Sequence, residues 1–273
     1  TNNMPTTIRK KNKISATQLR ALGEEVRRLT IEMSERSRSG ETGSSLSISD
    51  ILAVLYFHTL HIDPKKPNAK ERDRFILSKG HGAAAYYATL ALRGYFPIKK
   101  LLGHRVNGGH FHAHPSRSVG PGVEASTGSL GHGLSIGVGM ACAIKETKSK
   151  VYVLVGDGEC NEGSIWEAVM FAGHHNLGNI VVIVDDNKFQ GFGETKHTNR
   201  HDLGAQWLAF GWQVLRVNGH EPKDLMSVFS KAKKSRHPTV VIADTLAGKG
   251  IAHIENTLGA HYYIPDKKDV LRS

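Results

Sequence analysis

The chain has 273 residues, of which 39% are hydrophobic and 22% are charged, and its formal net charge is +11. This length and composition suit one large or two small folded domains, and they exclude a disordered chain, a disulfide miniprotein and a fibrous repeat. No run approaches the roughly 20 apolar residues that a membrane-spanning helix requires, so no membrane partner is expected. The only cysteines, Cys142 and Cys160, are too few for a disulfide framework, which favours free thiols and a cytoplasmic location.

The N-terminal segment 1–14 is predicted to be a basic tail. Its run Arg9-Lys10-Lys11-Asn12-Lys13 is of the kind found in nucleic-acid-binding patches. A charge run alone is more often a solvated tail, so we favour that interpretation and expect no nucleic-acid partner. The positive net charge would also attract anionic substrates toward a cleft.

The N-terminal half shows helical periodicity first and then a short strand. Apolar residues recur at three- and four-residue steps after Ser15, and a second such pattern follows Ser49, which suits a helix cap. Gly and Ser dominate between the two patterns, which indicates a loop. The predicted elements are, in order, a helix over 15–38, a loop over 39–45, a helix over 50–60, a strand over 74–78, a helix over 83–93 and an irregular Gly- and His-rich segment over 103–133.

The C-terminal half alternates apolar runs with helical patterns. Strands are predicted over 151–155, 180–184, 240–243 and, more weakly, 213–217, with helices over 133–146, 163–176, 202–210 and 222–234. Strands that are apolar on both faces and alternate with helices indicate an α/β fold, with a doubly wound, mostly parallel sheet and helices on both faces. No linker interrupts 15–273, so one domain is expected, with an irregular tail from about Gly248.

Two of the predicted strands end in polar residues. Gly156-Asp157-Gly158 follows the first of them, and Asn187 follows the next strand along the chain. In parallel sheets ligands bind beyond the carboxyl ends of the strands. If the strands are neighbours, a carboxylate, an amide and a main-chain carbonyl would provide oxygen ligands for a hard divalent cation such as Mg²⁺. Such an ion usually carries phosphate oxygens as well, which implies a bound diphosphate.

The segment from Gly156-Asp157-Gly158 to Asn187 resembles the thiamine diphosphate motif of the transketolase superfamily. Two further segments resemble the same family. They are 73–82, which includes Ser78-Lys79-Gly80-His81, and 126–134. The resemblance runs from about residue 15 to 262, with many motifs in the family's order. It implies the diphosphate-binding domain of a thiamine-diphosphate-dependent transferase that moves a two-carbon ketol unit from a ketose-type donor to an aldehyde acceptor.

The resemblance also implies roles for individual residues, with thiamine diphosphate and Mg²⁺ (or Ca²⁺) as cofactors. The implied metal ligands are Asp157, Asn187 and the main-chain oxygen of Phe189. The implied cofactor-binding residues are His81, Gly128, Leu130, Gly158, Asn187 and His261. The implied catalytic residues are His81, His114 and His261, together with Glu162, which resembles a carboxylate that links two active sites across a subunit interface. His110, His112 and His114 alternate, but Pro115 and the glycines around them argue for a loop and against a zinc cluster.

The sequence departs from the family pattern in two respects that bear on function. Glu41-Thr42 follows Ser39-Gly40, where transketolases have a substrate-contacting His-Pro, and Gly191 stands where a bulky apolar residue is common. In the family, the glutamate that activates the cofactor lies in the next domain, beyond the part that this sequence matches. The resemblance therefore implies a split enzyme, in which a partner chain supplies the pyrimidine-binding domain and the two assemble as a heterotetramer.

Two other functions remain open at this point. One is the α subunit of a thiamine-dependent 2-oxo acid decarboxylating or acyloin-forming enzyme. The acidic Glu41 leaves room for this function, because it departs from the family residue that contacts a sugar substrate. The other is a non-catalytic cofactor-binding relic, which the presence of Asp157, Asn187 and His81 disfavours. The donor that the reconstituted pair consumes would separate a ketol transferase from a 2-oxo acid enzyme.

Overall fold

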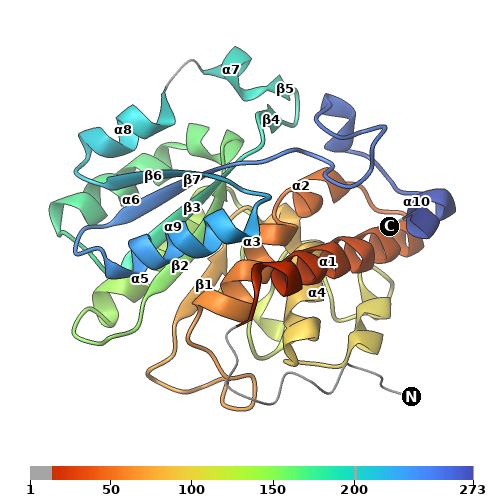
Figure 1. Ribbon diagram of the computed structural model, residues 1–273, viewed down its shortest axis with the longest axis horizontal. Coiled ribbons are helices and arrows are strands. Elements are labelled where there is room, and N and C mark those ends of the chain that lie inside the picture. Colours follow the sequence, from red (N-terminus) through yellow and green to blue (C-terminus); the bar gives the residue numbers. More distant parts are fainter. Residues whose placement is uncertain (1–13, 200–201, 273) are drawn as a thin grey trace.

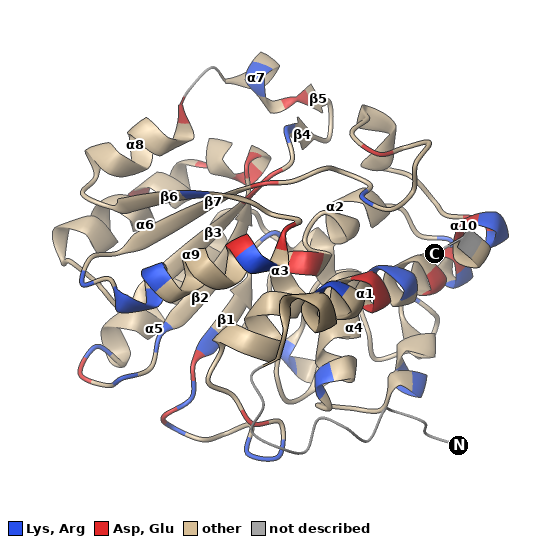
Figure 2. Ribbon diagram, viewed as in Figure 1, with Lys and Arg blue, Asp and Glu red and all other residues tan. Residues whose placement is uncertain are grey.

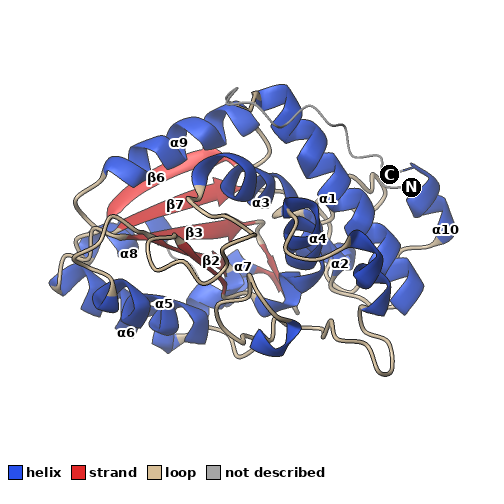
Figure 3. Cartoon of the chain, turned by 90° about the horizontal axis from the view of Figure 1, so that it is seen from below, coloured by secondary structure: helices blue, strands red, loops and turns tan. Residues whose placement is uncertain are grey.

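The computed structural model describes residues 14–199 and 202–272, so all but one residue of the predicted basic tail lies outside the described residues. A five-stranded sheet crosses the molecule, and helices cover both of its faces (Figure 1 and Figure 3). All its strands are parallel, which confirms the doubly wound α/β fold. Across the sheet, the order is β1 (Arg74–Leu77), β2 (Val151–Gly156), β3 (Ile180–Asp186), β7 (Thr239–Asp244) and β6 (Gln213–Asn218).

The strand order explains why the helices divide between the two faces. From β1 through β2 and β3 to β6 the chain advances in one direction, and α5 (His132–Ala143), α6 (Gly163–His174) and α8 (Leu203–Ala209) cover one face. From β6 to β7 the chain steps back, and α9 (Pro222–Lys234) covers the opposite face. Right-handed crossovers require this change of face when the direction reverses.

Alternate residues of each central strand enter two separate cores. On β2, Tyr152 and Leu154 pack with α1 (Ala16–Ser37), α3 (Ser49–Val54), α4 (Ala83–Arg93) and α9. Val151, Val153 and Val155 pack with α5, α6 and α8 on the other face. Both faces of these strands are therefore buried, as their uninterrupted apolar sequence predicts.

Two predictions of local structure are wrong. Residues 42–46, predicted as mostly loop, form the short helix α2 (Thr42–Leu46), because burial of the whole segment outweighs the weak helix propensity of Gly and Ser. The tail beyond Gly248 is not irregular throughout: it contains η6 (Leu258–Ala260) and α10 (Lys267–Arg272) and packs on α1 and α2 through Ile251, Ile254 and Ala260. The predicted helix over 50–60 is α3 followed by the π-helical turn η1 (Leu55–Thr59).

The remaining elements are short and lie around the carboxyl ends of the strands or between the helices. The short elements are η2 (Gly80–Gly82), η3 (Ile98–Gly103), η4 (Arg117–Val119), η5 (Gly158–Asn161), the hairpin of β4 (Phe189–Gln190) and β5 (Gly193–Glu194), and α7 (Thr195–Thr198).

Within the described residues, no helix is both long enough and apolar enough to cross a bilayer.

Candidate active site

The carboxyl ends of β2 and β3 lie side by side. Gly156 pairs with Asp185 in the parallel register, and the Asp157 amide donates a hydrogen bond to the Asp185 carbonyl oxygen at 3.1 Å. The strands that carry Asp157 and Asn187 are therefore neighbours, as the candidate site requires. Acidic residues gather at these strand ends, near β4 (Figure 2).

One cavity of about 450 Å³ lies over these strand ends. Its volume is within the range of small-molecule and cofactor pockets. Its wall contains every site residue that was predicted from the sequence. These residues are His81, His114, Gly128, Leu130, Asp157, Gly158, Glu162, Asn187, Phe189 and His261.

Hydrogen bonds bring distant loops to this cavity. The Thr127 hydroxyl donates to the Leu77 carbonyl oxygen at 2.7 Å, which fixes the Gly128 loop at the end of β1. The Tyr87 hydroxyl donates to the His114 carbonyl oxygen at 2.9 Å. Gly128 has a φ of +155°, and a Cβ there would lie 3.3 Å from the His114 ring. The loop can therefore approach the histidine closely only because it carries a glycine at this position.

Asp157 is a buried carboxylate whose surroundings suit a cation. Its Oδ2 accepts hydrogen bonds from the Lys188 amide at 2.9 Å and the Thr195 hydroxyl at 3.1 Å. Burial, followed by the nearby charges of Asp185 and Asp186, raises the pKa of Asp157 to about 7. A divalent cation at this position would offset both effects and favour the ionised form.

Asn187 has its side-chain amide oriented by Asp185. The Asn187 Nδ2 donates to Asp185 Oδ2 at 2.9 Å, while Oδ1 accepts from the Phe189 amide at 3.0 Å. Asp185 also accepts from the Ser47 hydroxyl at 2.7 Å and forms a fully buried ion pair with Lys79. Burial alone would raise the pKa of Asp185, but Lys79 and the hydroxyl donors hold it below its ordinary value. The ionised Asp185 carboxylate can only accept hydrogen bonds. The NH₂ group of Asn187 therefore points toward Asp185, and the Asn187 Oδ1 points away from it.

Two of the predicted histidines are close neighbours in the cavity wall. The ring centroids of His81 and His261 are 6.0 Å apart. Burial, with the adjacent Lys79 charge, lowers the pKa of His81 to about 3 and lowers the pKa of His261 as well. His81 is therefore a neutral ring at physiological pH, with one nitrogen that donates and one that accepts.

This protonation state leads to a testable expectation for His81. Its imidazole should stay neutral between pH 8 and pH 5, because burial and Lys79 oppose the charged form. In ¹⁵N-histidine spectra of the cofactor-free protein, the His81 ring signals, assigned by their loss in His81→Asn, should not titrate over this range. Titration near pH 6.5 would contradict the environment described here.

The structure places both departures from the family pattern at the cavity. Glu41 has a left-handed φ of +66°, lines the cavity and forms an ion pair with Arg105 at 3.2 Å. Gly191 is also in the wall, and a Cβ there would lie 3.0 Å from the Tyr262 hydroxyl. Tyr262 thus fills part of the space that a larger residue at 191 would occupy.

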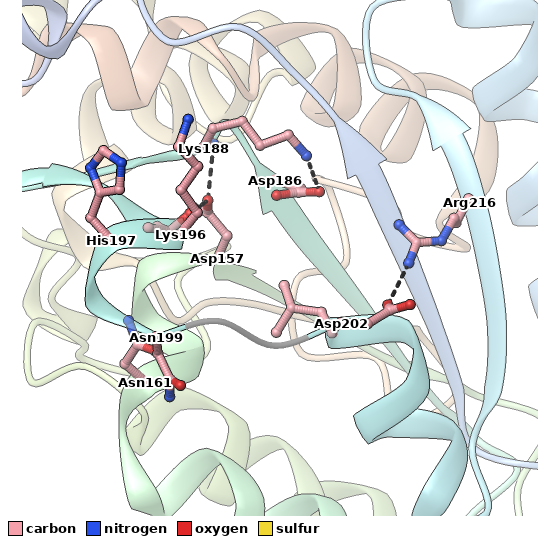
Figure 4. A pocket seen from close by; sticks show the side chains of 11 residues that line it. Asp157, Asn161, Asp186, Lys188, Lys196, His197, Asn199, Asp202 and Arg216 are labelled. Carbon is pink, nitrogen blue, oxygen red and sulfur yellow. Dashed lines mark hydrogen bonds and ion pairs between the residues drawn. The ribbon is translucent and has the colours of Figure 1, made fainter.

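A second cavity of about 630 Å³ lies beside the first and shares Asp157 and Asn161 with it (Figure 4). Its cationic side chains are engaged by carboxylates. Lys188 pairs with Asp186, and Arg216 pairs with Asp202 at 2.9 Å. Lys196 pairs with Glu194. The first cavity, and not this one, contains Asn187, Phe189 and Gly158 as well as the histidines, so it is the better candidate for a diphosphate.

Sequence reasoning missed three buried charged residues of the site, Lys79, Asp185 and Glu159. Each lies inside a motif that was recognised, but each also contacts a residue 81 or more positions away in the sequence. For Lys79 and Asp185 the only signal in the sequence was a charged residue directly after a predicted apolar strand.

The geometry defines an α/β protein with a polar cavity at the carboxyl edge of its parallel sheet. The family model described as "Transketolase, thiamine diphosphate binding domain" matches residues 20–271. The 6-deoxy-6-sulfo-D-fructose transketolase subunit SqwG of Clostridium sp. (strain MSTE9) is 41% identical over 240 residues, which are 86% of this chain and 87% of that protein. One of the subunits of the apulose-4-phosphate transketolase of Actinobacillus succinogenes is 40% identical, over 94% of this chain and 95% of its own.

Solved structures agree with the sequence relatives. The transketolase of Campylobacter jejuni superposes with a TM-score of 0.89 at 32% identity, over 94% of this chain and 42% of its own. The chain thus spans about two fifths of the complete transketolases that it matches. It belongs to the transketolase family and matches its thiamine diphosphate-binding domain, which confirms the expected family, fold and class of thiamine-diphosphate-dependent, transketolase-like transferase.

Proposed function

We propose that this chain is the diphosphate-binding half of a two-chain transketolase that moves a two-carbon ketol unit between sugars. The observation that carries the proposal is the meeting of Asp157 and Asn187 at two adjacent strand ends, inside the same cavity as His81, His114 and His261. A cofactor-binding relic would need only the residues that hold the cofactor, whereas a sugar substrate gives the three histidines hydroxyl groups to bind.

The residues at the strand ends fit thiamine diphosphate and a divalent cation. Among the described residues, no group of three or more His, Cys, Asp or Glu is arranged to hold a metal ion. At the two strand ends, a metal would take Asp157, the Asn187 amide oxygen and the Phe189 carbonyl, and would complete its shell with diphosphate oxygens. The buried Asp157 carboxylate, whose pKa is raised to about 7, is the group that gains most from such a cation.

When bound, the cofactor supplies the carbanion chemistry that breaks and forms the carbon–carbon bond. The protein residues bind and orient the reactants. Gly158 would let the backbone approach the diphosphate, and Gly128 and Leu130, which line the same cavity, would contact another part of the cofactor. His81 is neutral, so it can donate a hydrogen bond to a substrate oxygen from one nitrogen and accept one at the other. His114 and His261 offer further contacts to hydroxyl groups in the same cavity.

A partner chain would provide the pyrimidine-binding domain of the site. Two relatives that match this chain over almost their whole length are named as transketolase subunits, which supports assembly with a second polypeptide. The outer faces of α5 and α6 carry exposed apolar side chains, among them Ile136, Met170 and Phe171. Glu162 precedes α6 at the cavity rim beside this surface. Covering this face with the partner chain, and completing a heterotetramer, would bury those side chains.

The donor distinguishes this proposal from its alternative. The complex with the pyrimidine-binding chain should consume a ketose and release an aldose two carbons shorter. It should not release carbon dioxide from 2-oxo acids such as pyruvate, because the three histidines of the cavity suit the hydroxyl groups of a ketose. Product analysis by mass spectrometry, with matched ketose and 2-oxo acid donors, decides the question. Carbon dioxide release without ketose consumption would favour the 2-oxo acid enzyme.

A further inference from the structure

Glu159 is a buried acid that holds three segments of the cavity wall together. It lies in the turn after β2, is 3% exposed and borders the cavity. Its Oε1 accepts from the Ser78 hydroxyl at 2.5 Å and from the Gly131 amide at 2.8 Å. Its Oε2 accepts from the Gly156 amide at 3.0 Å. One carboxylate thus links the end of β1, the end of β2 and the loop before α5.

Each donor lies within three residues of a group that the proposed function places on the cofactor. Ser78 lies three residues before His81, and Gly156 directly precedes Asp157. Gly131 directly follows Leu130. A shift of any of the three segments would therefore move part of the proposed cofactor site, while Glu159 itself needs no contact with the cofactor.

The packing around the carboxylate is tight. A Cβ at Gly131 would lie 2.1 Å from the Ser164 hydroxyl, and a Cβ at Gly133 would lie 2.5 Å from the Ser78 hydroxyl. These close contacts hold the loop before α5 against Ser78 and Ser164, so the donors cannot easily turn toward other acceptors. The three donors consequently depend on Glu159 for their acceptor.

An acid at this place needs an explanation, because it borders a cavity that we assign to an anionic diphosphate. Burial of a carboxylate costs solvation, and here the three donors offset that cost. Only a carboxylate accepts at both of its oxygens. A glutamine side chain would turn its NH₂ group toward the Gly156 amide in one orientation and toward the Gly131 amide in the other, so one donor would always lose its partner.

We propose that Glu159 is a positioning residue that sets the spacing between the Asp157 strand end, the Gly128–Leu130 loop and the His81 turn, and thereby the affinity for thiamine diphosphate. This inference rests on the proposed function. It assigns to Glu159 no part in the bond-breaking step, so the substitution should act on cofactor binding and leave the chemistry intact once the cofactor is bound.

The test compares Glu159→Gln with the wild type in the complex with the pyrimidine-binding chain. The dissociation constant of thiamine diphosphate, measured by calorimetry with saturating Mg²⁺, should rise about 10- to 100-fold. With saturating cofactor, kcat and the substrate KM should stay within about threefold of the wild type. A purely structural role would instead lower kcat by reducing the folded fraction, with the cofactor affinity unchanged, and that result would overturn the proposal.

Ser78→Ala is the matched control. It removes one donor and leaves the two backbone donors on Glu159, so the dissociation constant of thiamine diphosphate should rise less than in Glu159→Gln. An equal rise of the thiamine diphosphate dissociation constant in Ser78→Ala and Glu159→Gln would overturn the role that we assign to the two backbone donors, Gly131 and Gly156. If Glu159→Gln does not assemble, Glu159→Asp keeps the charge but is one methylene shorter, and wild-type affinity in that variant would also overturn the proposal. A wild-type complex that binds no thiamine diphosphate would refute the proposed function itself.

Discussion

Asp157→Asn is expected to abolish most Mg²⁺-dependent binding of thiamine diphosphate while it stabilises the cofactor-free protein. Asp157 is the one charged side chain of the proposed metal ligands, so its loss should weaken cofactor binding by at least on the order of 100-fold. The amide oxygen of asparagine can still accept from the Lys188 amide and the Thr195 hydroxyl, so the loop around it should remain in place. Calorimetric titration of the complex with the cofactor and Mg²⁺ measures the loss.

The gain in stability has a defined pH window. The pKa of Asp157 rises from 3.8 to about 7 in the folded chain. Between these values the folded state binds more protons than the unfolded state, so the wild type loses stability as the pH rises through the window. Asparagine has no such loss. In EDTA, the melting temperature of the variant should exceed that of the wild type at pH 8, and the difference should shrink toward pH 4.

Asp186→Asn is the control for this experiment. Asp186 follows Asp185 on the same strand and pairs with Lys188, but it lines the neighbouring cavity and not the one that contains the histidines. The affinity of the Asp186→Asn variant for thiamine diphosphate should therefore stay within about threefold of the wild type. Equal losses in both variants would show that general negative charge, and not the Asp157 carboxylate, determines binding, and would contradict the metal assignment.

The sequence predicted the sheet and the motif positions because these depend on local patterns. Uninterrupted apolar runs such as 151–155 and 180–184 suit burial on both faces, and polar residues at the carboxyl ends of such strands indicate ligand sites. The short helix α2 was missed because burial by the C-terminal tail, which approaches it through a Gly248 amide to Gly43 carbonyl bond of 3.1 Å, outweighs its Gly- and Ser-rich sequence.

The charged interior of the site could not be predicted in the same way. The Lys79–Asp185 ion pair and the contacts of Glu159 join residues that are far apart in sequence. Whether a charged residue after a strand faces solvent or a buried partner depends on which loops fold over it. Residue type alone gives no such information, and an isolated Lys or Glu is usually exposed.

The chain by itself is expected to show no detectable ketol transfer, and activity should appear when the pyrimidine-binding chain is added. The cavity is lined by the residues that we assign to the metal, the diphosphate and the sugar hydroxyls. In the family, the glutamate that activates the cofactor lies in the next domain, beyond the part that this chain matches. Cofactor affinity should also be weak in the isolated chain, because only part of the cofactor would be covered.

The measurement is a titration of the partner chain against a fixed amount of this chain, with ketose consumption as the readout. The rate should rise by about 1,000-fold or more and saturate at equal amounts, as expected for an obligate complex with an interface above roughly 2,000 Å². Replacement of Met170 by aspartate on the exposed face of α6 should shift saturation to higher partner concentrations, whereas the same change at Lys145, an exposed residue just after α5, should not. Full activity of the isolated chain would contradict the two-chain site, because it would show that this polypeptide alone both holds and activates the cofactor.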